Sequence, residues 1–273
     1  MIKFPSQYLN FTDTLECGQV FRFTRSDGGY YVYSLDKCAY VENNGDLALI
    51  DGDESFSDYF DLALDYSAIC ARARSYGIQK LTSAVDRHEG LRILRQDRFE
   101  ALCSFIISQN NNIPRIKSTI EKLCAAFGEE KNFNGKSYHA FPTAEALACA
   151  STDTLRSLGL GYRDEYVKGF AEAVASGALS LSALENLSTK DLRDTLVSVK
   201  GVGNKVADCA LLFGFGRTDA FPVDTWIEKL YKEDFHGELS SRKKIAEFFT
   251  SLFGYDSGYV QQYLFYAKRE SEF

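Results

Sequence analysis

Several residue types are scarce in this sequence. Its 273 residues include four prolines, one methionine and one tryptophan, and its three histidines are scattered at His88, His139 and His236. The seven cysteines contain no Cys-x-x-Cys pair, which excludes a zinc ribbon or an iron–sulfur site of that type. Their odd number and irregular spacing predict reduced thiols in an intracellular protein. The histidines are expected to be surface or hydrogen-bonded residues.

Long apolar runs and excess positive charge are also missing. No run approaches the length of a membrane span, and the opening residues "MIKFPSQYLNFTDTL" lack the apolar core of a signal peptide. We therefore expect a soluble protein with no membrane partner. Lys and Arg number 31 against 38 Asp and Glu, a formal net charge of -7. Any contact with nucleic acid must then depend on a small local surface.

Patterning predicts an α+β fold, and a hydrophobic content of 45% allows a sizeable core. Residues 19–51 alternate apolar and polar residues and break at Asp27-Gly28-Gly29 and Asn44-Gly45, which predicts an antiparallel sheet with one face packed on the rest of the protein. We expect an N-terminal antiparallel β domain with short helices over residues 1–87 and a mainly α-helical domain over residues 88–273. Helices are expected from about Ser55, in 96–112, and near 114–127, 143–157, 163–176, 189–197, 204–215, 223–231 and 241–253.

The stretch "SVKGVGNKVADC", residues 198–209, places Gly201 and Gly203 just before an apolar helix. Glycines permit a tight turn and let backbone N–H groups approach a phosphate, and the helix N-terminus also favours an anion. This pattern indicates a sequence-independent grip on a nucleic-acid backbone. An ordinary corner between two helices with a glycine C-cap would look the same.

Lys205 and Asp224 make the pattern more specific. Lys205 lies at the helix start, where the dipole disfavours its protonated form, as a nucleophilic amine requires. "FPVD" places Asp224 nineteen residues later, at the start of another helix, where it can cap that helix or act beside the amine. The alternative for Lys205 is a surface lysine paired with Asp208. A lysine, an aspartate and a phosphate grip together indicate cleavage of an N-glycosidic bond.

These motifs resemble the helix-hairpin-helix DNA glycosylases, and among them the 8-oxoguanine DNA glycosylases of the eukaryotic type. "GVGNKVADC" and "FPVD" match the family's hairpin, lysine and aspartate, and other family segments follow in the family's order over nearly the whole chain: "GQVFRF", "LRILRQDRFEALCSFIISQNNNIPRI", "LGLGYRDEYV" and Gln261 to Phe265. The resemblance implies a base-excision repair enzyme that flips 8-oxoguanine, opposite cytosine, out of duplex DNA. Lys205 would attack C1′ and form an imine, Asp224 would assist, and β-elimination would nick the strand.

The resemblance also implies roles for the binding residues. The Gly18 carbonyl would accept from the N7–H of 8-oxoguanine, Gln261 would bind the pairing edge, and Cys209 and Phe265 would sandwich the base. Residues implied to contact the orphaned cytosine or the opposite strand are Asn110, Arg115, Tyr162 and Arg163. Such an enzyme needs no organic cofactor, is expected to be a monomer, and would lie in the cytoplasm (nucleoid) of a bacterium or the nucleus of a eukaryote.

Two residues depart from the family, and one cation site is implied. Trp226 stands where a histidine near the DNA phosphate is usual, and Lys268 where an aspartate near the base pocket is frequent. Backbone carbonyls of Val197, Val199 and Val202 are expected to hold a structural cation.

Three alternatives remain open. An endonuclease III-like glycosylase shares the lysine and aspartate, but it usually carries an iron–sulfur cluster. A methylated-purine glycosylase lacks the lysine. A non-catalytic hairpin module would bind DNA without using Lys205 or Asp224.

Overall fold

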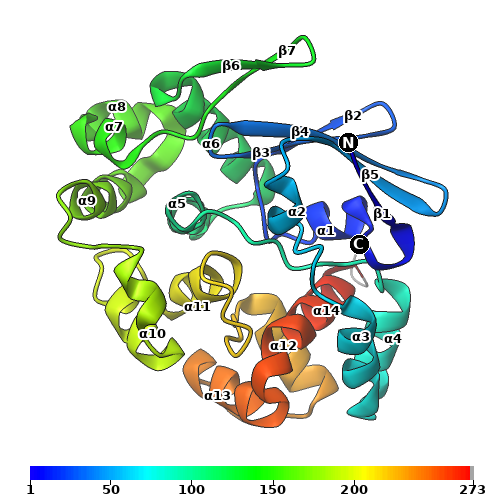
Figure 1. Cartoon of the computed structure of the whole chain (residues 1–273). Coiled ribbons are helices and arrows are strands. Elements are labelled where there is room, and N and C mark those ends of the chain that lie inside the picture. Colours follow the sequence, from blue (N-terminus) through cyan, green and yellow to red (C-terminus); the bar gives the residue numbers. More distant parts are fainter. Residues whose placement is uncertain (271–273) are drawn as a thin grey trace.

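The first part of the chain folds into an antiparallel sheet, as the alternating pattern predicts. The computed structural model describes residues 1–270 (Figure 1). The sheet has the order β1-β5-β4-β3-β2, and its strands are β1 (Ile2–Pro5), β2 (Phe23–Ser26), β3 (Gly29–Ser34), β4 (Lys37–Asn44) and β5 (Leu47–Gly52). Both predicted hairpins are present, with Gly28 at φ +84° and Gly45 at φ +59°. Strand β1 and the turn at Leu35 were not predicted.

One face of the sheet is buried, which also agrees with the pattern. Val32 pairs with Ala39, and Val41 pairs with Ile50, and all four side chains are fully buried. They pack against the short helices α1 (Phe11–Glu16) and α2 (Phe56–Tyr59). The sheet thus has a small core of its own.

Helices make up most of the rest of the chain. They are α3 (Tyr66–Ser75), α4 (Gln79–Arg87), α5 (Arg98–Ser108), α6 (Ile113–Phe127), α7 (Ala144–Cys149), α8 (Thr152–Leu155), α9 (Asp164–Ala175), α10 (Thr189–Val197), α11 (Asn204–Phe213), α12 (Thr225–Asp234), α13 (Arg242–Phe253) and α14 (Ser257–Glu270). Short 3-10 or π turns lie at Ser6–Tyr8, Arg156–Leu160, Gly161–Arg163, Ala183–Asn186 and Gly254–Asp256. The predicted helices at 114–127, 163–176, 189–197, 204–215 and 241–253 are confirmed to within two residues.

The helix predicted over 143–157 is wrong as one element. The chain leaves the helix at Ala150, and the side chain of Ser151 caps a new one by accepting from the Thr154 N–H. A hairpin of β6 (Glu130–Phe133) and β7 (Lys136–His139) was missed, although its Asn134-Gly135 turn is a hairpin signal. Helix α14 was also missed.

The larger core crosses the predicted domain boundary. Ile69, Leu81 and Val85 of α3 and α4 lie in the same buried cluster as Val260 and Leu264 of α14. These two helices therefore pack with the C-terminal end of the chain, beside which the first residues also lie (Figure 1). The division between residues 87 and 88 stays a prediction.

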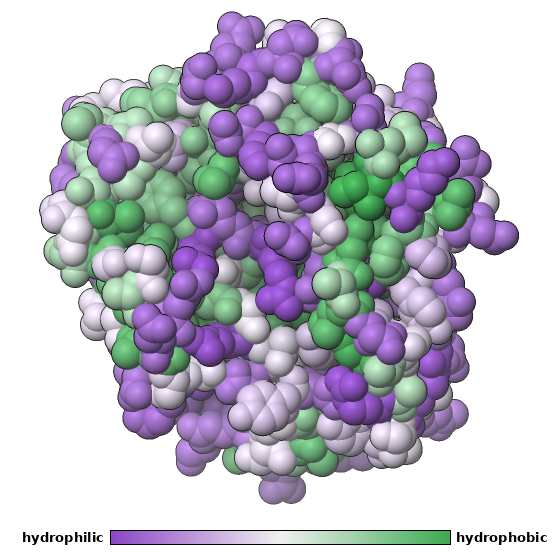
Figure 2. All heavy atoms as spheres, in the orientation of Figure 1, coloured by the Kyte–Doolittle hydropathy of each residue, from purple (hydrophilic) through white to green (hydrophobic). Residues whose placement is uncertain are grey.

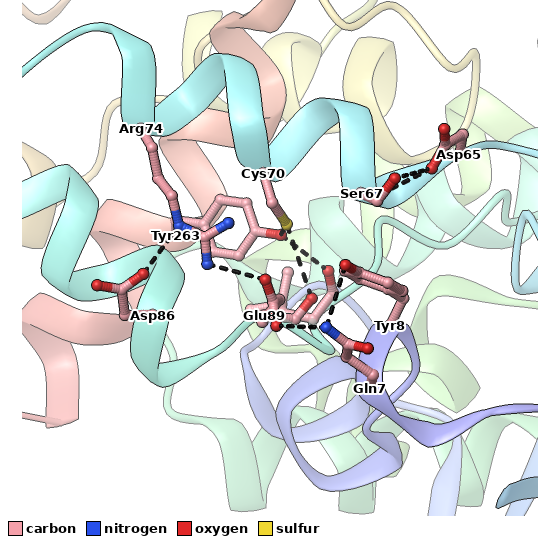
Figure 3. Close-up of polar contacts among 10 residues, drawn as sticks. Gln7, Tyr8, Asp65, Ser67, Cys70, Arg74, Asp86, Glu89 and Tyr263 are labelled. Atoms are coloured by element: carbon pink, nitrogen blue, oxygen red, sulfur yellow. Dashed lines mark hydrogen bonds and ion pairs between the residues drawn. The ribbon is translucent and has the colours of Figure 1, made fainter. Parts of the chain in front are cut away.

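Polar contacts link α3 to the end of α4 and to α14 (Figure 3). The Arg74 guanidinium donates to Asp86 at 2.9 Å and to Glu89 at 2.8 Å, which joins α3 to the end of α4. The Cys70 thiol lies 3.4 Å from the Tyr263 hydroxyl, which joins α3 to α14. These contacts matter for function because α14 carries two of the predicted base-pocket residues.

The outer surface is mostly polar. Figure 2 shows hydrophilic side chains over much of one face, with hydrophobic side chains in separate areas. Within residues 1–270, no helix is both long and apolar enough to cross a membrane.

Candidate active site

The six residues predicted to carry the chemistry and the base pocket line one cavity. Its walls are Gly18, Phe105, Lys205, Cys209, Phe213, Pro222, Asp224, Gln261, Gln262 and Phe265. The cavity measures about 40 Å³, which admits water but is too small for a purine base. Residues from the two ends of the chain therefore meet at one site, as the resemblance implies. Their roles in the chemistry stay predictions.

Lys205 is the second residue of α11, two positions after the hairpin glycine Gly203. Its side chain is half-buried, and its Nζ lies 5.2 Å from the centre of the Phe105 ring. The helix is more enclosed than predicted: instead of one apolar stripe, every residue from Val206 to Phe213 is buried. Lys205 thus lies at the exposed end of a buried helix, with its amine near the Phe105 ring in the cavity wall.

Cys209 lies one helical turn after Lys205. Burial raises the pKa of the Cys209 thiol to about 11, against the opposing effect of the Lys205 charge. A thiol with this pKa stays protonated at neutral pH and is a poor nucleophile. Cys209 therefore lines the cavity as a neutral thiol, and Lys205 is the better candidate for nucleophilic attack.

Asp224 caps α12, which confirms the structural role expected of it. Its Oδ1 accepts hydrogen bonds of 3.0 Å from the N–H groups of Trp226 and Ile227. The cap fixes the carboxylate beside the cavity. Because both of these bonds go to Oδ1, the cap does not use Oδ2. Asp224 can therefore serve the helix and the reaction at the same time.

The hairpin requires its first glycine for two reasons. Gly201 has φ +90°, and a Cβ there would lie 2.3 Å from Cγ of Tyr166. Gly203 is different: it is exposed, and a Cβ added to it would meet no atom within 4 Å. An open glycine at the N-terminus of α11 leaves the backbone N–H groups accessible to a phosphate.

A wider cleft of about 730 Å³ lies beside the cavity and shares Gly18, Lys205, Asp224 and Phe265 with it. Its other lining residues include Ser108–Pro114 of the α5–α6 turn and Gly203, Thr225, Trp226 and Arg242. DNA bound in this cleft would thus meet both the hairpin residue Gly203 and the α5–α6 turn.

Asn110 and Tyr162 are brought together at the cleft. Asn110 Nδ2 lies 3.2 Å from the Tyr162 hydroxyl, and Tyr162 is 51% exposed, which excludes a core role for its ring. Asn110 has φ +45°, a conformation that asparagine tolerates better than most residues. Of the "NNN" segment, Asn112 is a structural cap, since its side chain accepts from the Arg115 N–H at 3.0 Å.

The two arginines expected to hold the orphaned cytosine are not alike. Arg115 is exposed on the first turn of α6, as a DNA-contacting residue should be. Arg163 is buried, and it donates to the carbonyls of Gln109 at 2.7 Å, Asn110 at 3.0 Å and Leu160 at 3.1 Å. In this structure Arg163 supports the turn that presents Asn110.

The structure shows the surroundings of Lys268 and Trp226, the two residues that depart from the family pattern. Lys268 pairs with Glu233 at 2.7 Å and Asp234 at 3.0 Å, so α12 carboxylates offset its charge. Lys268 does not line the base cavity, whereas Trp226 lines the adjoining cleft.

The predicted cation site involves main-chain atoms only. The carbonyl of Val199 accepts from the Val202 N–H at 3.0 Å, and Val197 is 39% exposed at the end of α10. Over the described part of the chain, no cluster of three or more His, Cys, Asp and Glu side chains could hold a metal ion. The cation at the carbonyls stays a prediction.

Several residues of the site were missed from sequence. Phe105, Phe213, Pro222 and Gln262 line the cavity, and Gln109 donates from Nε2 to the Gly201 carbonyl at 2.9 Å. The two phenylalanines have the spacing of ordinary core residues, so no local signal separates them from the core.

An ion pair with a buried carboxylate joins the two helices of the hairpin and gives a testable pH dependence. Arg193 of α10 donates to Asp208 of α11 at 2.7 Å, and burial raises the pKa of Asp208 to about 6. This pKa is higher than the pKa of an aspartate in the unfolded chain, which is about 3.9. The folded protein therefore binds the proton more tightly, and the stability that this contributes is present below pH ~4 and is lost as pH rises through ~6. We predict that Asp208→Asn gains stability relative to wild type across this window.

Urea unfolding of both proteins at several pH values would measure this gain, with Asp194→Asn on the exposed Lys190–Asp194 pair as a control. The opposite trend would mean that attraction to Arg193 outweighs the cost of burying the carboxylate.

Comparisons with known proteins agree with this geometry. A family model for the HhH-GPD superfamily of base excision DNA repair proteins matches residues 103–254. A model for the N-terminal domain of 8-oxoguanine DNA glycosylases matches residues 1–102. Together the two models cover the sheet, the hairpin and the residues of the cavity up to α13.

Similar proteins carry related names. The chain is 32% identical over 213 residues to a probable N-glycosylase/DNA lyase of Methanothermobacter thermautotrophicus, covering 71% of this chain and 68% of the relative. It is 37% identical over 167 residues to the N-glycosylase/DNA lyase of Saccharomyces cerevisiae, covering 57% of this chain but only 44% of the yeast protein.

A solved structure is similar over almost the whole chain. It is the 8-oxoguanine glycosylase/lyase of Clostridium acetobutylicum in complex with double-stranded DNA containing cytosine opposite 8-oxoguanine. The TM-score is 0.92 at 37% identity, over 97% of this chain and 93% of that one. The chain belongs to the helix-hairpin-helix superfamily of base excision DNA repair proteins and, within it, to the 8-oxoguanine DNA glycosylases.

Proposed function

We propose that this protein removes 8-oxoguanine from duplex DNA, with cytosine opposite, and then nicks the abasic strand. The observation that carries the proposal is the single cavity in which Lys205 and Asp224 meet the base-pocket residues. A non-catalytic hairpin module would not need an amine, a carboxylate and a base pocket at one site. The activity in the names of the similar proteins is of the same kind.

The reaction uses side chains alone. The neutral Lys205 amine attacks C1′ of the flipped nucleotide, the C1′–N9 bond breaks, and the base leaves with the bonding electrons and takes up a proton. The Asp224 carboxylate stabilises positive charge that develops on the sugar. Opening of the sugar ring gives an imine at Lys205, which makes the C2′ hydrogens acidic. Loss of one C2′ proton then expels the 3′ phosphate by β-elimination.

Recognition of the base uses hydrogen-bonding groups of the cavity that are available to a ligand. Gln261 is buried, its Nε2 donates to the Pro222 carbonyl at 3.2 Å, and its Oε1 is buried without a hydrogen-bond partner. A base N–H donor would satisfy Oε1, which otherwise remains an unpaired buried acceptor. The Gly18 carbonyl distinguishes 8-oxoguanine, which carries N7–H, from guanine, which does not. The cavity has to widen to admit the base, because its volume of about 40 Å³ is too small for a purine.

The same proposal defines partners and setting. The partner is double-stranded DNA bound by a monomer, in the nucleoid of a bacterium or the nucleus of a eukaryote. No organic cofactor takes part, and the cation at the carbonyls of Val197, Val199 and Val202 supports the hairpin without a redox role.

A panel of lesion duplexes tests the proposal. Wild type should cleave 8-oxoguanine opposite cytosine faster than opposite adenine, and Arg115→Ala should lose most of this preference because Arg115 is exposed beside the cleft. The loss should be worth about 1–3 kcal/mol of discrimination. Products are compared with and without heating in alkali, which separates base removal from strand cleavage. Preferred excision of an oxidised pyrimidine would instead support an endonuclease III-like activity.

A further inference from the structure

Helix α14 and the segment after α1 form two sides of the base cavity, although they lie at opposite ends of the chain. Gln261 and Phe265 come from α14, and Gly18 follows α1 directly. A displacement of about 1 Å between reacting or recognising groups can cost about 100-fold in rate. The separation of these two segments therefore needs to be fixed by specific contacts.

Arg269 makes such a contact. It lies one helical turn after Phe265, and its Nη2 donates to the Glu16 carbonyl at the end of α1. Its guanidinium lies 5.5 Å from the centre of the Phe265 ring and 5.2 Å from that of Tyr266. One side chain thus joins the wall residue Phe265 to the backbone just before Gly18.

A second contact supports the same segment. Gln262 donates from Nε2 to the Cys17 carbonyl at 3.3 Å. Two consecutive carbonyls before Gly18 are therefore bonded to side chains of α14, and the Gly18 carbonyl is the next one along the chain.

The fit around Gly18 is close and leaves one donor of Arg269 unused. A Cβ on Gly18 would lie 2.9 Å from Arg269 Nη1 and 3.5 Å from Phe265. Nη1 is buried and has no hydrogen-bond partner, an arrangement that costs more for a charged group than for a neutral one. Nη1 is therefore packed against Gly18 and is not bonded to another group.

We propose that Arg269 is a positioning residue that sets the separation between the Phe265 ring and the Gly18 carbonyl, and thereby the selectivity for the damaged base. This inference rests on the proposed function of the cavity. Arg269 acts through Phe265 and Gly18 and takes no part in bond breaking at the sugar. Its loss should therefore impair base excision and spare the steps that follow base removal.

The test compares two rates in single-turnover experiments on the full chain. One is excision of 8-oxoguanine opposite cytosine, and the other is β-elimination at a preformed abasic site, which has no base to position. Arg269→Ala should lower excision by about 10- to 100-fold and change β-elimination by less than about 3-fold. A parallel fall in both rates, or unchanged excision, would overturn the inference.

Arg72→Ala is the matched control. Arg72 pairs with Asp256 at 2.8 Å, so it anchors the other end of α14 far from Gly18. Both variants remove an arginine that holds α14, and their melting temperatures report any general loosening. Of these two variants, only Arg269→Ala should change the ratio of the excision rate to the β-elimination rate. An equal change in Arg72→Ala would mean that Arg269 only anchors α14 and does not position the base pocket.

Arg269→Lys keeps the test decisive if the alanine variant does not fold. Lysine retains a positive charge on the Phe265 ring and loses the fork that reaches Glu16, so its rate ratio should lie between those of wild type and Arg269→Ala. A wild-type ratio would overturn the role given to the Glu16 contact. The wild-type arm decides the proposed function separately, since failure to release 8-oxoguanine at all would refute that function whatever the variants do.

Discussion

Replacing Lys205 with glutamine should abolish base excision, with a loss of at least about 10³-fold in single-turnover rate. Glutamine keeps a polar side chain of similar shape against the Phe105 ring, and the buried residues of α11 that follow are untouched. It has no amine, so neither attack on C1′ nor an imine is possible. Affinity for duplex DNA containing 8-oxoguanine should stay close to that of wild type, because Gly18, Gln261 and Phe265 still form the base pocket.

Borohydride trapping makes the result specific to the nucleophile. Borohydride reduces the imine to a stable amine, so wild type should form a covalent complex with lesion DNA that Lys205→Gln does not form. Lys117→Gln is the matched control, since Lys117 lies 3.6 Å from the centre of the Phe23 ring and outside the base cavity. A trapped complex that persists in Lys205→Gln would assign the imine to another amine.

Local signals in the sequence predicted the parts of the site that depend on local structure. The hairpin was predictable because Gly201 adopts a conformation and a close contact that only glycine allows. The cap at Asp224 was predictable because aspartate before an apolar helical pattern is a frequent N-cap. The positions of Lys205 and Asp224 beside one cavity follow from these two local elements together with the resemblance.

Contacts between distant segments were not predictable. Arg163 bonds to carbonyls more than fifty residues earlier in the chain, so its burial has no local signature. Arg269 and Glu16 are separated by 253 positions, and nothing in the sequence near either residue indicates the other. These long-range bonds determine how the site is held, whereas the motifs determine what it contains.

Helix α14 escaped prediction for a related reason. Every residue from Ser257 to Leu264 is buried, so the helix has no single apolar face and the sequence shows no helical period. Polar residues such as Gln261 and Gln262 interrupt the apolar pattern, and their partners, Pro222 and Cys17, belong to other elements. The two glutamines that break the apolar pattern both line the base cavity.

Asp224→Asn should separate the two roles of Asp224. Asparagine caps a helix about as well as aspartate, so α12 should remain intact and the melting temperature should hardly change. Only the negative charge beside the amine and the sugar is lost, and we expect excision to slow by about 10²- to 10⁴-fold. Asp224→Ala should be as slow and also lose the cap, at about 1 kcal/mol, or roughly 2–4 °C in melting temperature.

Asp65→Asn is the matched control for this comparison. Asp65 caps α3 by accepting from the N–H groups of Ser67 at 2.9 Å and Ala68 at 3.4 Å, and it does not line the cavity. Single-turnover excision and thermal melting on all three variants and wild type give the result. A near-normal excision rate in Asp224→Asn would mean that Asp224 only caps α12 and takes no part in the reaction. A slow rate with an unchanged melting temperature would show that the carboxylate acts on the reaction, since the same substitution at Asp65 removes a charged cap without touching the amine.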